Sequence, residues 1–283
     1  MPEYLAASGV TIFYDVHEAK TPPHAIVQLV HGVGEHSGRY GALIDALTTA
    51  GYTVYADDHL GHGRTGMQQW AGDASRLGRP GKGGLQAMIA ALATFTELIR
   101  DENPDLPLVI LGHSLGSYFT QILLNRLPDA YAGVVLSATS LRLLGWTNAG
   151  PLNARWAGPD AMGTEWLSSD HAVGRAFLDD PLTTTSTLQQ LVGWADSLRL
   201  QGLPRRNPGT DVPILLMVGR DDPLGGPRSV HKLADAYRTR SRYTDVTTLV
   251  YPGARHEIFN EVVQQDVRAD LIAWLDRRFP PRD

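Results

Sequence analysis

The stretch LPLVILGHSLGSYFTQILL (residues 106–124) decides the fold of this chain. The apolar run at 108–111 predicts a buried strand, and helical spacing of apolar residues resumes after Gly116. Ser114 stands at the turn between them. Gly-x-Ser-x-Gly between a strand and a helix is typical of a nucleophile elbow, in which a strained turn presents the serine at the carboxyl end of a sheet. We therefore predict a nucleophilic Ser114, with Gly112 and Gly116 where a Cβ atom would collide. The alternative is a small-residue turn that only packs the strand against the helix.

Short apolar runs alternate with longer helical patterns on both sides of this stretch. Strands are expected at 10–16, 25–30, 52–56, 108–111, 134–136, 214–218 and 246–251. Helices are expected at 40–50, 85–99, directly after Ser114, at 230–237 and at 262–279. Repeated strand–helix units predict an α/β fold, a mostly parallel central sheet with helices on both faces.

The alternation breaks between about residues 141 and 206. This segment has several Gly and Pro breaks and no convincing strand, and it holds four of the six tryptophans, Trp146, Trp156, Trp166 and Trp194. We expect a helical cap (141–205) inserted into a core formed by 1–140 and 206–283. The cap would cover the carboxyl edge of the sheet, where ligands bind in such folds.

Composition excludes several classes of protein. The 283 residues carry a net charge of −5 and no Lys/Arg run, so nucleic acid is not an expected partner. The absence of cysteine excludes disulfides, thiolate catalysis and cysteine-based zinc sites. Neither a signal peptide nor an apolar run of membrane-spanning length is visible, so we expect a cytoplasmic protein. We expect no metal and no cofactor.

A serine nucleophile needs a histidine base held by a carboxylate, and in this type of fold the chain order is serine, acid, histidine. Asp221 and Asp222 follow the strand expected at 214–218. We favour Asp222 because Pro223 fixes the turn behind it; Asp221 is the alternative, and a solvated turn is the inert interpretation. His256 follows the strand expected at 246–251, after a Pro-Gly loop, and is the predicted base.

An oxyanion hole needs two backbone N–H donors. We predict Leu115, which begins the helix after Ser114, and Val33, which lies between two glycines in the loop after the strand at 25–30. An ordinary glycine turn is the alternative for that loop. Glu35 and His36 are expected to brace it, and Arg39 to pair with Glu35 or another nearby acid.

Residues 61–66 match Gly-x-Gly-x-x-Gly, but no helix is expected to open there, so we do not predict a nucleotide site. His59 and His62, with Asp57 and Asp58 beside them, suggest a metal site. A glycine-rich loop does not fix their geometry, and we favour a structural role.

Five stretches together resemble the α/β-hydrolase superfamily, and within it the monoacylglycerol lipase and lysophospholipase branch. They are HGVGEHSGRY (31–40), DHLGHGRTG (58–66), GHSLGS (112–117), GRDDPLGG (219–226) and YPGARHEIFNE (251–261). The resemblance implies a triad of Ser114, Asp222 and His256, with Val33 and Leu115 as oxyanion donors. One position departs from the branch: Ser117 stands where glycine is frequent, and its hydroxyl would line the acyl pocket or bond to the backbone.

These observations predict a serine hydrolase that cleaves carboxylic esters through an acyl-enzyme, and that acts on a monoacylglycerol, a lysophospholipid or a similar medium- to long-chain ester. A small-ester carboxylesterase is an alternative. A serine aminopeptidase is another, with Asp160, Glu165 or Asp170 holding the substrate amine. A non-catalytic binding protein of the same fold is the alternative from a different class.

The expected partners are the small acyl ester and, transiently, a lipid surface; the sequence leaves the oligomeric state open. Apolar cap residues are expected either to contact the acyl chain or to form the cap's own core. The candidates for acyl contact are Leu141, Leu143, Trp146, Met162, Trp166 and Phe177.

Overall fold

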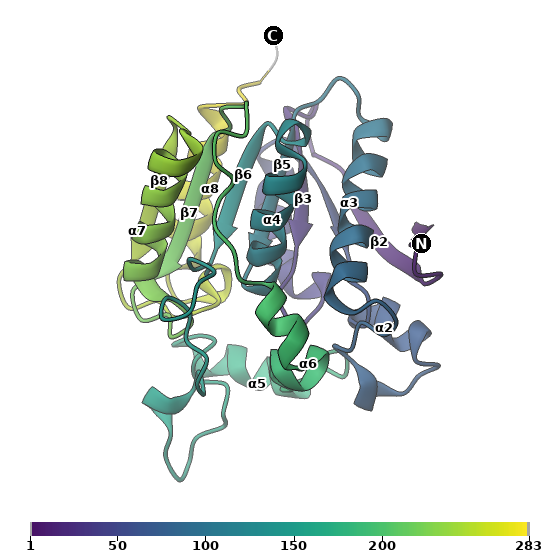
Figure 1. Ribbon diagram of the computed structural model, residues 1–283, viewed down its shortest axis with the longest axis vertical. Helices are drawn as coiled ribbons and strands as arrows, with labels where there is room; N and C mark the ends of the chain where they lie inside the picture. The colour runs from purple at the N-terminus through teal and green to yellow at the C-terminus, as the bar shows by residue number, and fades with distance from the viewer. Residues whose placement is uncertain (1, 282–283) are drawn as a thin grey trace.

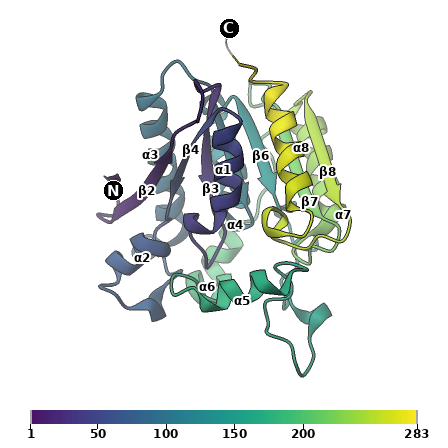
Figure 2. The same cartoon turned by 180° about the vertical axis from the view of Figure 1, so that it is seen from behind.

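The computed structural model describes residues 2–281, which form one eight-stranded sheet with helices on both faces (Figures 1 and 2). The strand order is β1-β2-β4-β3-β5-β6-β7-β8. At one edge, β1 (Glu3–Leu5) pairs antiparallel with β2 (Thr11–His17), and β2 pairs antiparallel with β4 (Tyr52–Asp57). Every other neighbouring pair in the described sheet is parallel. The expected α/β architecture is confirmed.

The central strands are mostly apolar, and they are buried along their whole length because helices cover both faces of the sheet. The strands that are buried at every position are β3 (Ala25–Val30), β4, β5 (Leu108–His113), β6 (Gly133–Ser137) and β7 (Ile214–Gly219), followed at the far edge by the half-buried β8 (Val246–Tyr251). In register, Val30 lies beside Gly112, and His113 beside Ser137. The loops that leave these strands therefore meet at one edge of the sheet.

Helices α1 (Gly41–Thr49) and α8 (Gln264–Asp276) cover one face, and α3 (Gly84–Glu102), α4 (Leu115–Arg126) and α7 (Gly226–Ala236) cover the other (Figure 2; Figure 1). Each face has its own apolar core. Short turns of helix complete the core of the fold: η1 (Ser37–Tyr40), η2 (Ala74–Arg76), η3 (Pro128–Ala130), the π-helical η5 (Tyr237–Ser241) and η6 (Ile258–Asn260). Within residues 2–281, no helix has both the length and the apolar character needed to cross a membrane.

One expectation about a helix is wrong. The sequence predicts that none opens at residues 61–66, yet α2 (Gly63–Gln69) begins inside that motif. Tertiary contacts outweigh its poor helix propensity, since the Thr65 hydroxyl accepts from the Phe13 N–H at 3.0 Å and the Gln69 side chain accepts from the Gly61 N–H at 2.9 Å. The Asp58 carboxylate already accepts from the Arg64 N–H at 3.0 Å. A carboxylate of the protein thus occupies the place that a phosphate would need.

Segment 141–205 lies at the carboxyl end of the sheet and carries η4 (Ala154–Trp156), α5 (His171–Asp179) and α6 (Leu188–Arg199) (Figure 1). Its sequence marks both α-helix starts: the Asp170 side chain accepts from the Ala172 N–H, and Thr187 and Gln190 form a capping box. We propose that this segment is the cap.

Arg142 ties the two ends of the proposed cap to the core. Its guanidinium is buried, with Nε donating to the Gln121 side chain on α4 at 3.1 Å and NH1 donating to the Leu200 carbonyl. The Gly202 N–H donates back to the Arg142 carbonyl at 2.7 Å. The outgoing and returning arms are therefore held side by side against α4.

Candidate active site

Ser114 lies at the sharp turn between β5 and α4 with a backbone conformation that is unusual for a side chain, φ 52° and ψ −120°. Close packing requires glycine on both sides of it. A Cβ atom at Gly112 would lie 2.3 Å from the Thr120 hydroxyl, and one at Gly116 would lie 2.1 Å from the Val30 carbonyl oxygen. The strained turn is thus imposed by β3, β5 and α4 together.

Ser114 is more covered than the sequence predicts, with only 8% of its surface exposed. Gly32 packs against it so closely that a Cβ there would be 3.2 Å from the Ser114 Cβ. Ser117 is fully buried, and its hydroxyl lies 2.6 Å from the Ser114 carbonyl oxygen and 2.8 Å from the Thr139 hydroxyl. Of the two roles considered for the Ser117 hydroxyl, the bond to the backbone is the one that the structure shows.

His256 follows β8 and meets Asp222, which follows β7. The His256 Nδ1 lies 3.0 Å from Asp222 Oδ1, and both residues are buried. Asp222 Oδ1 also accepts from the Leu224 N–H at 2.9 Å. Asp221 instead points to the surface and pairs with Arg155 at 2.6 Å. Of the two candidate acids, Asp222 is the one that the structure places against the imidazole.

The surroundings of His256 favour its charged form. Burial alone would lower the pKa of His256, but the charge and hydrogen bond of Asp222, together with the charges of Glu257 and Glu35, outweigh burial and raise the pKa above its ordinary value. The imidazole is therefore well suited to take up a proton.

The other side of the imidazole is available. Among residues 2–281, the buried His256 Nε2 has no hydrogen-bond partner, and no hydrogen bond joins it to Ser114. His113, the chain neighbour of Ser114, lies with its ring centroid 5.1 Å from that of His256. Catalytic hydrogen bonds are frequently long in unliganded enzymes and tighten when substrate binds. The arrangement places a basic nitrogen without a partner beside the strained turn.

Both predicted oxyanion donors are also available. In the part of the chain that the structure describes, the N–H groups of Val33 and Leu115 donate to no protein acceptor. The Leu115 N–H belongs to the first turn of α4, where helix N–H groups lack partners within the helix. The preceding Gly32 N–H is not available, because it donates to Glu35 Oε1 at 2.6 Å.

A buried ionic cluster joins the Val33 loop to the His256 loop. Arg39 bonds to Glu35 at 2.9 Å and to both oxygens of Glu257 at 2.6 and 2.9 Å, and Tyr40 donates to Glu35 at 2.6 Å. Burial raises the pKa of Glu35, and the charge of Arg39 opposes that effect. The sequence analysis does not single out Glu257, although this residue directly follows the predicted base His256.

The histidines near this loop are held by the protein. His59 Nδ1 lies 3.0 Å from Asp57 Oδ2, and the His59 ring stacks on His31 with centroids 3.6 Å apart. Burial lowers the pKa of His62 to about 4. The described residues contain no grouping of three side chains placed to hold a metal ion. These contacts support a structural role for the cluster.

The six apolar residues that were predicted to contact substrate fall into two groups. The Trp166 ring lies 4.8 Å from that of His256, and Phe177 lies under Arg39, 4.7 Å from its guanidinium. Met162 is near them in sequence and space, beside Gly174 on α5. Leu141, Leu143 and Trp146 instead line a hollow of about 290 Å³ beside α7. Trp166, Phe177 and Met162 therefore lie on the side of the proposed cap near His256, whereas the other three residues do not.

The acids considered for binding a substrate amine are mostly occupied. Glu165 accepts from the Met162 N–H at 2.6 Å, from the Gly163 N–H at 3.0 Å and from Asn153 at 2.8 Å. Asp170 caps α5, and Asp160 is exposed. Glu165 and Asp170 therefore already accept hydrogen bonds from the backbone of the proposed cap.

Comparisons with known proteins identify a family and several similar enzymes. The chain matches the family described as serine aminopeptidase, S33, over residues 21–263. It is 30% identical over 280 residues to a monoacylglycerol lipase of Mycolicibacterium smegmatis, covering 96% of this chain and 95% of that protein. It is 26% identical to a monoglyceride lipase of Mus musculus, covering 98% and 91%. A carboxyl esterase from Bacillus coagulans has a similar fold, with a TM-score of 0.86 at 24% identity and 98% of both chains covered.

Proposed function

The chain belongs to the α/β-hydrolase family described as serine aminopeptidase, S33, and we propose that it cleaves medium- or long-chain acyl esters. The observation that carries the proposal is the buried His256–Asp222 pair, whose Nε2 has no partner within residues 2–281 and lies beside the strained turn of Ser114. This is the arrangement that a serine nucleophile requires.

In the proposed mechanism, the Ser114 oxygen attacks the ester carbonyl carbon while its proton passes to His256 Nε2. The N–H groups of Val33 and Leu115 bind the oxygen on which negative charge develops. His256 then gives the proton to the departing alcohol, which leaves an acyl-enzyme. Water repeats the sequence and releases the carboxylic acid. Asp222 stays ionised and holds the Nδ1–H, which orients the ring and stabilises the imidazolium.

The class of substrate is proposed from the cap and the relatives. The Trp166 ring beside His256 gives the site an apolar wall from the cap side. The relative with 30% identity is a monoacylglycerol lipase. We infer that a monoacylglycerol or a similar single-chain ester is the natural substrate. A series of p-nitrophenyl esters from acetyl to hexadecanoyl tests this, with kcat/KM expected to peak at octanoyl or longer; a peak at acetyl would indicate a small-ester carboxylesterase.

The first experiment compares the wild-type enzyme with Ser114→Ala. Removing the nucleophile should lower kcat on p-nitrophenyl octanoate by about 10⁴-fold or more, because the members of a triad act as a unit. Ser117→Ala is the matched control, since its hydroxyl is buried below the turn and bonds to the backbone. Labelling by a fluorophosphonate probe should disappear only in Ser114→Ala. Turnover and labelling that survive in Ser114→Ala would contradict the proposal.

An aminopeptidase activity is less well supported. Such an enzyme should need an acid in the cap to hold a free amine, and Glu165 already accepts three hydrogen bonds from the protein. Release of p-nitroanilide from amino-acid substrates should therefore be negligible beside ester hydrolysis.

A further inference from the structure

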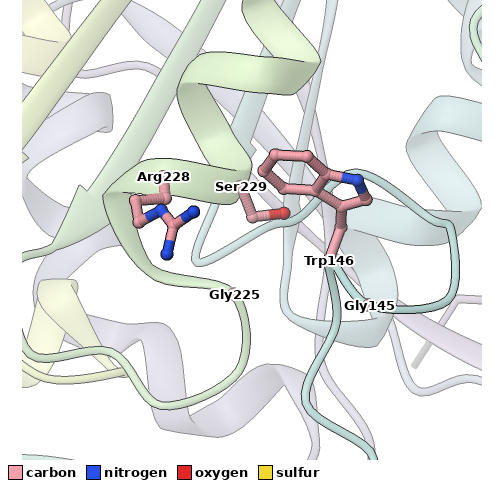
Figure 3. A pocket seen from close by; sticks show the side chains of 5 residues that line it. All are labelled: Gly145, Trp146, Gly225, Arg228 and Ser229. Carbon is pink, nitrogen blue, oxygen red and sulfur yellow. The ribbon is translucent and has the colours of Figure 1, made fainter.

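Two hollows lie side by side along α7, on the side away from α8. The first, of about 200 Å³, is lined by Gly145, Trp146, Gly225, Arg228 and Ser229. The second, of about 290 Å³, shares Trp146 with it and follows α7 onward through Lys232 and Ala236 to Arg240. Figure 3 shows the Trp146 ring directed toward Ser229 across the first hollow. We call the two together the α7 groove.

The wall opposite α7 is apolar and comes from the two arms of the proposed cap. Leu141, Leu143 and Trp146 belong to the outgoing arm and Leu203 to the returning arm. Leu203 remains 38% exposed, so the groove opens to solvent along this wall. The rings that pack on His256 are those of Trp166 and His113, and neither residue lines the groove. The groove therefore lies apart from the face of the proposed cap that covers His256.

The α7 side of the groove is cationic, in a chain whose net charge is −5. Arg228 and Lys232 are one helical turn apart and exposed, and neither side chain has a hydrogen bond or ion pair within the described residues. Arg240 donates its Nε to the Pro204 carbonyl at 2.6 Å, and none of its other nitrogens has a partner in residues 2–281. Asp235 is the one acid in the lining, and it lies 3.6 Å from Arg238 outside the groove.

We propose that the α7 groove binds a long-chain carboxylate, with the alkyl chain against Leu143, Trp146 and Leu203 and the carboxylate at Lys232 and Arg228. An apolar wall facing unpaired cations is complementary to a single-chain anion, because a charge-assisted hydrogen bond fixes one end and apolar burial holds the other. The choice of this ligand class rests on the proposed function, since ester cleavage releases such an acid.

The groove also adjoins the loop that carries the proposed catalytic acid. Gly225 in its lining is three residues beyond Asp222, and the Asn148 N–H, two residues after Trp146, donates to the Leu224 carbonyl at 2.7 Å. A ligand that extends into the first hollow therefore meets both the outgoing arm of the proposed cap, at Trp146, and the loop that carries Asp222, at Gly225.

The binding test uses the full-length Ser114→Ala protein, so that its result does not depend on turnover. The probe is 12-bromododecanoate, whose bromine quenches the fluorescence of an indole that it contacts. We expect saturable quenching that is largely lost in a Trp146→Phe background and retained in Trp194→Phe, because Trp194 is 68% exposed on α6 and lies outside the groove. Quenching that is unchanged by Trp146→Phe would overturn the proposal.

Charge reversal at an exposed position tests the cationic side without disturbing the core. Lys232→Glu should raise the Kd for dodecanoate at least about tenfold by titration calorimetry, whereas Lys82→Glu, an exposed lysine before α3, should leave it unchanged. Dodecanol should bind more weakly than dodecanoate and equally to both variants. Absence of binding, or equal dodecanoate affinity in Lys232→Glu and Lys82→Glu, would refute the site while leaving ester hydrolysis by the wild-type enzyme untouched.

Discussion

Single residues near His256 decide which groups the reaction can use. Asp222 is buried against the imidazole, whereas its neighbour Asp221 is partly exposed and paired with Arg155. We expect Asp222→Asn to lower kcat by about 10⁴-fold, because an amide disfavours the tautomer that leaves Nε2 free to accept a proton. Asp221→Asn should change kcat little, since it removes only a surface ion pair. Steady-state kinetics on one ester checks both; a larger loss in Asp221→Asn would contradict the assignment.

The pH dependence of activity should reflect the charges around His256. The base works only when neutral, so kcat/KM falls as the pH drops through its pKa. That pKa is raised above its ordinary value of about 6.5, because Asp222, Glu257 and Glu35 outweigh the effect of burial. The acid limb of the profile is therefore expected above pH 6.5.

Glu257→Gln removes one of those charges and should move the acid limb to lower pH, while Glu97→Gln on the exposed side of α3 should not move it. A profile that is flat from pH 5 to pH 8 would argue against a histidine base. The shift in pH, as opposed to a loss of rate alone, distinguishes an electrostatic effect from damage to the fold.

At the scale of elements, the sequence predicts those whose pattern is complete within a short continuous stretch of chain. The ranges of β3 and β8 are predicted to the residue, because each is an unbroken run of residues that favour strands. The turn before α4 is predicted because its glycines have a steric cause. The edge strand β1 is missed because its three residues are too few to show a pattern, and helix α2 is missed because it depends on a partner distant in the chain, Phe13. The bonds from Arg39 to Glu257, which span 218 residues, could not be read from local pattern for the same reason.

The packing between β3 and α4 gives a stability prediction. Gly116→Ala would place a Cβ 2.1 Å from the Val30 carbonyl oxygen, so backbone must shift. We expect a loss of at least about 2 kcal/mol in the free energy of unfolding. Gly41→Ala at the start of α1 is the matched control: it has open space and helical dihedral angles, and should gain about 0.5–1 kcal/mol. Urea denaturation measures both, and equal stability of the two variants would refute the steric account.

At the scale of the whole molecule, one carboxylate joins the loop that carries His256 to the proposed cap. Glu261 is almost fully buried and accepts from the Ser169 N–H and hydroxyl at 2.8 and 2.5 Å, from the Arg255 N–H at 2.8 Å and from the Val262 N–H at 3.0 Å. It fastens the two parts together directly beside the proposed base.

Glu261→Ala should therefore lower both stability and kcat. Leaving several buried donors without an acceptor is expected to cost about 2–4 kcal/mol. Glu97→Ala on the exposed face of α3 should cost less than about 0.5 kcal/mol. Thermal unfolding and ester kinetics measured on the same samples check this. Loss of stability with unchanged kcat would show that Glu261 does not help to place His256.

The guanidinium of Arg142 limits where the proposed cap can be exchanged for the cap of another hydrolase. It is a buried cation whose hydrogen-bond acceptors come from α4 and from the returning arm at Leu200. A chimera whose junctions lie between Arg142 and Leu200 keeps these hydrogen bonds of the guanidinium. A chimera that keeps Arg142 but replaces the returning arm at Leu200 leaves a buried charge without one of its acceptors, with a penalty large enough to decide whether the hybrid folds. Useful crossover sites therefore lie between residues 143 and 199, and libraries built there should contain many more folded members than libraries cut a few residues wider.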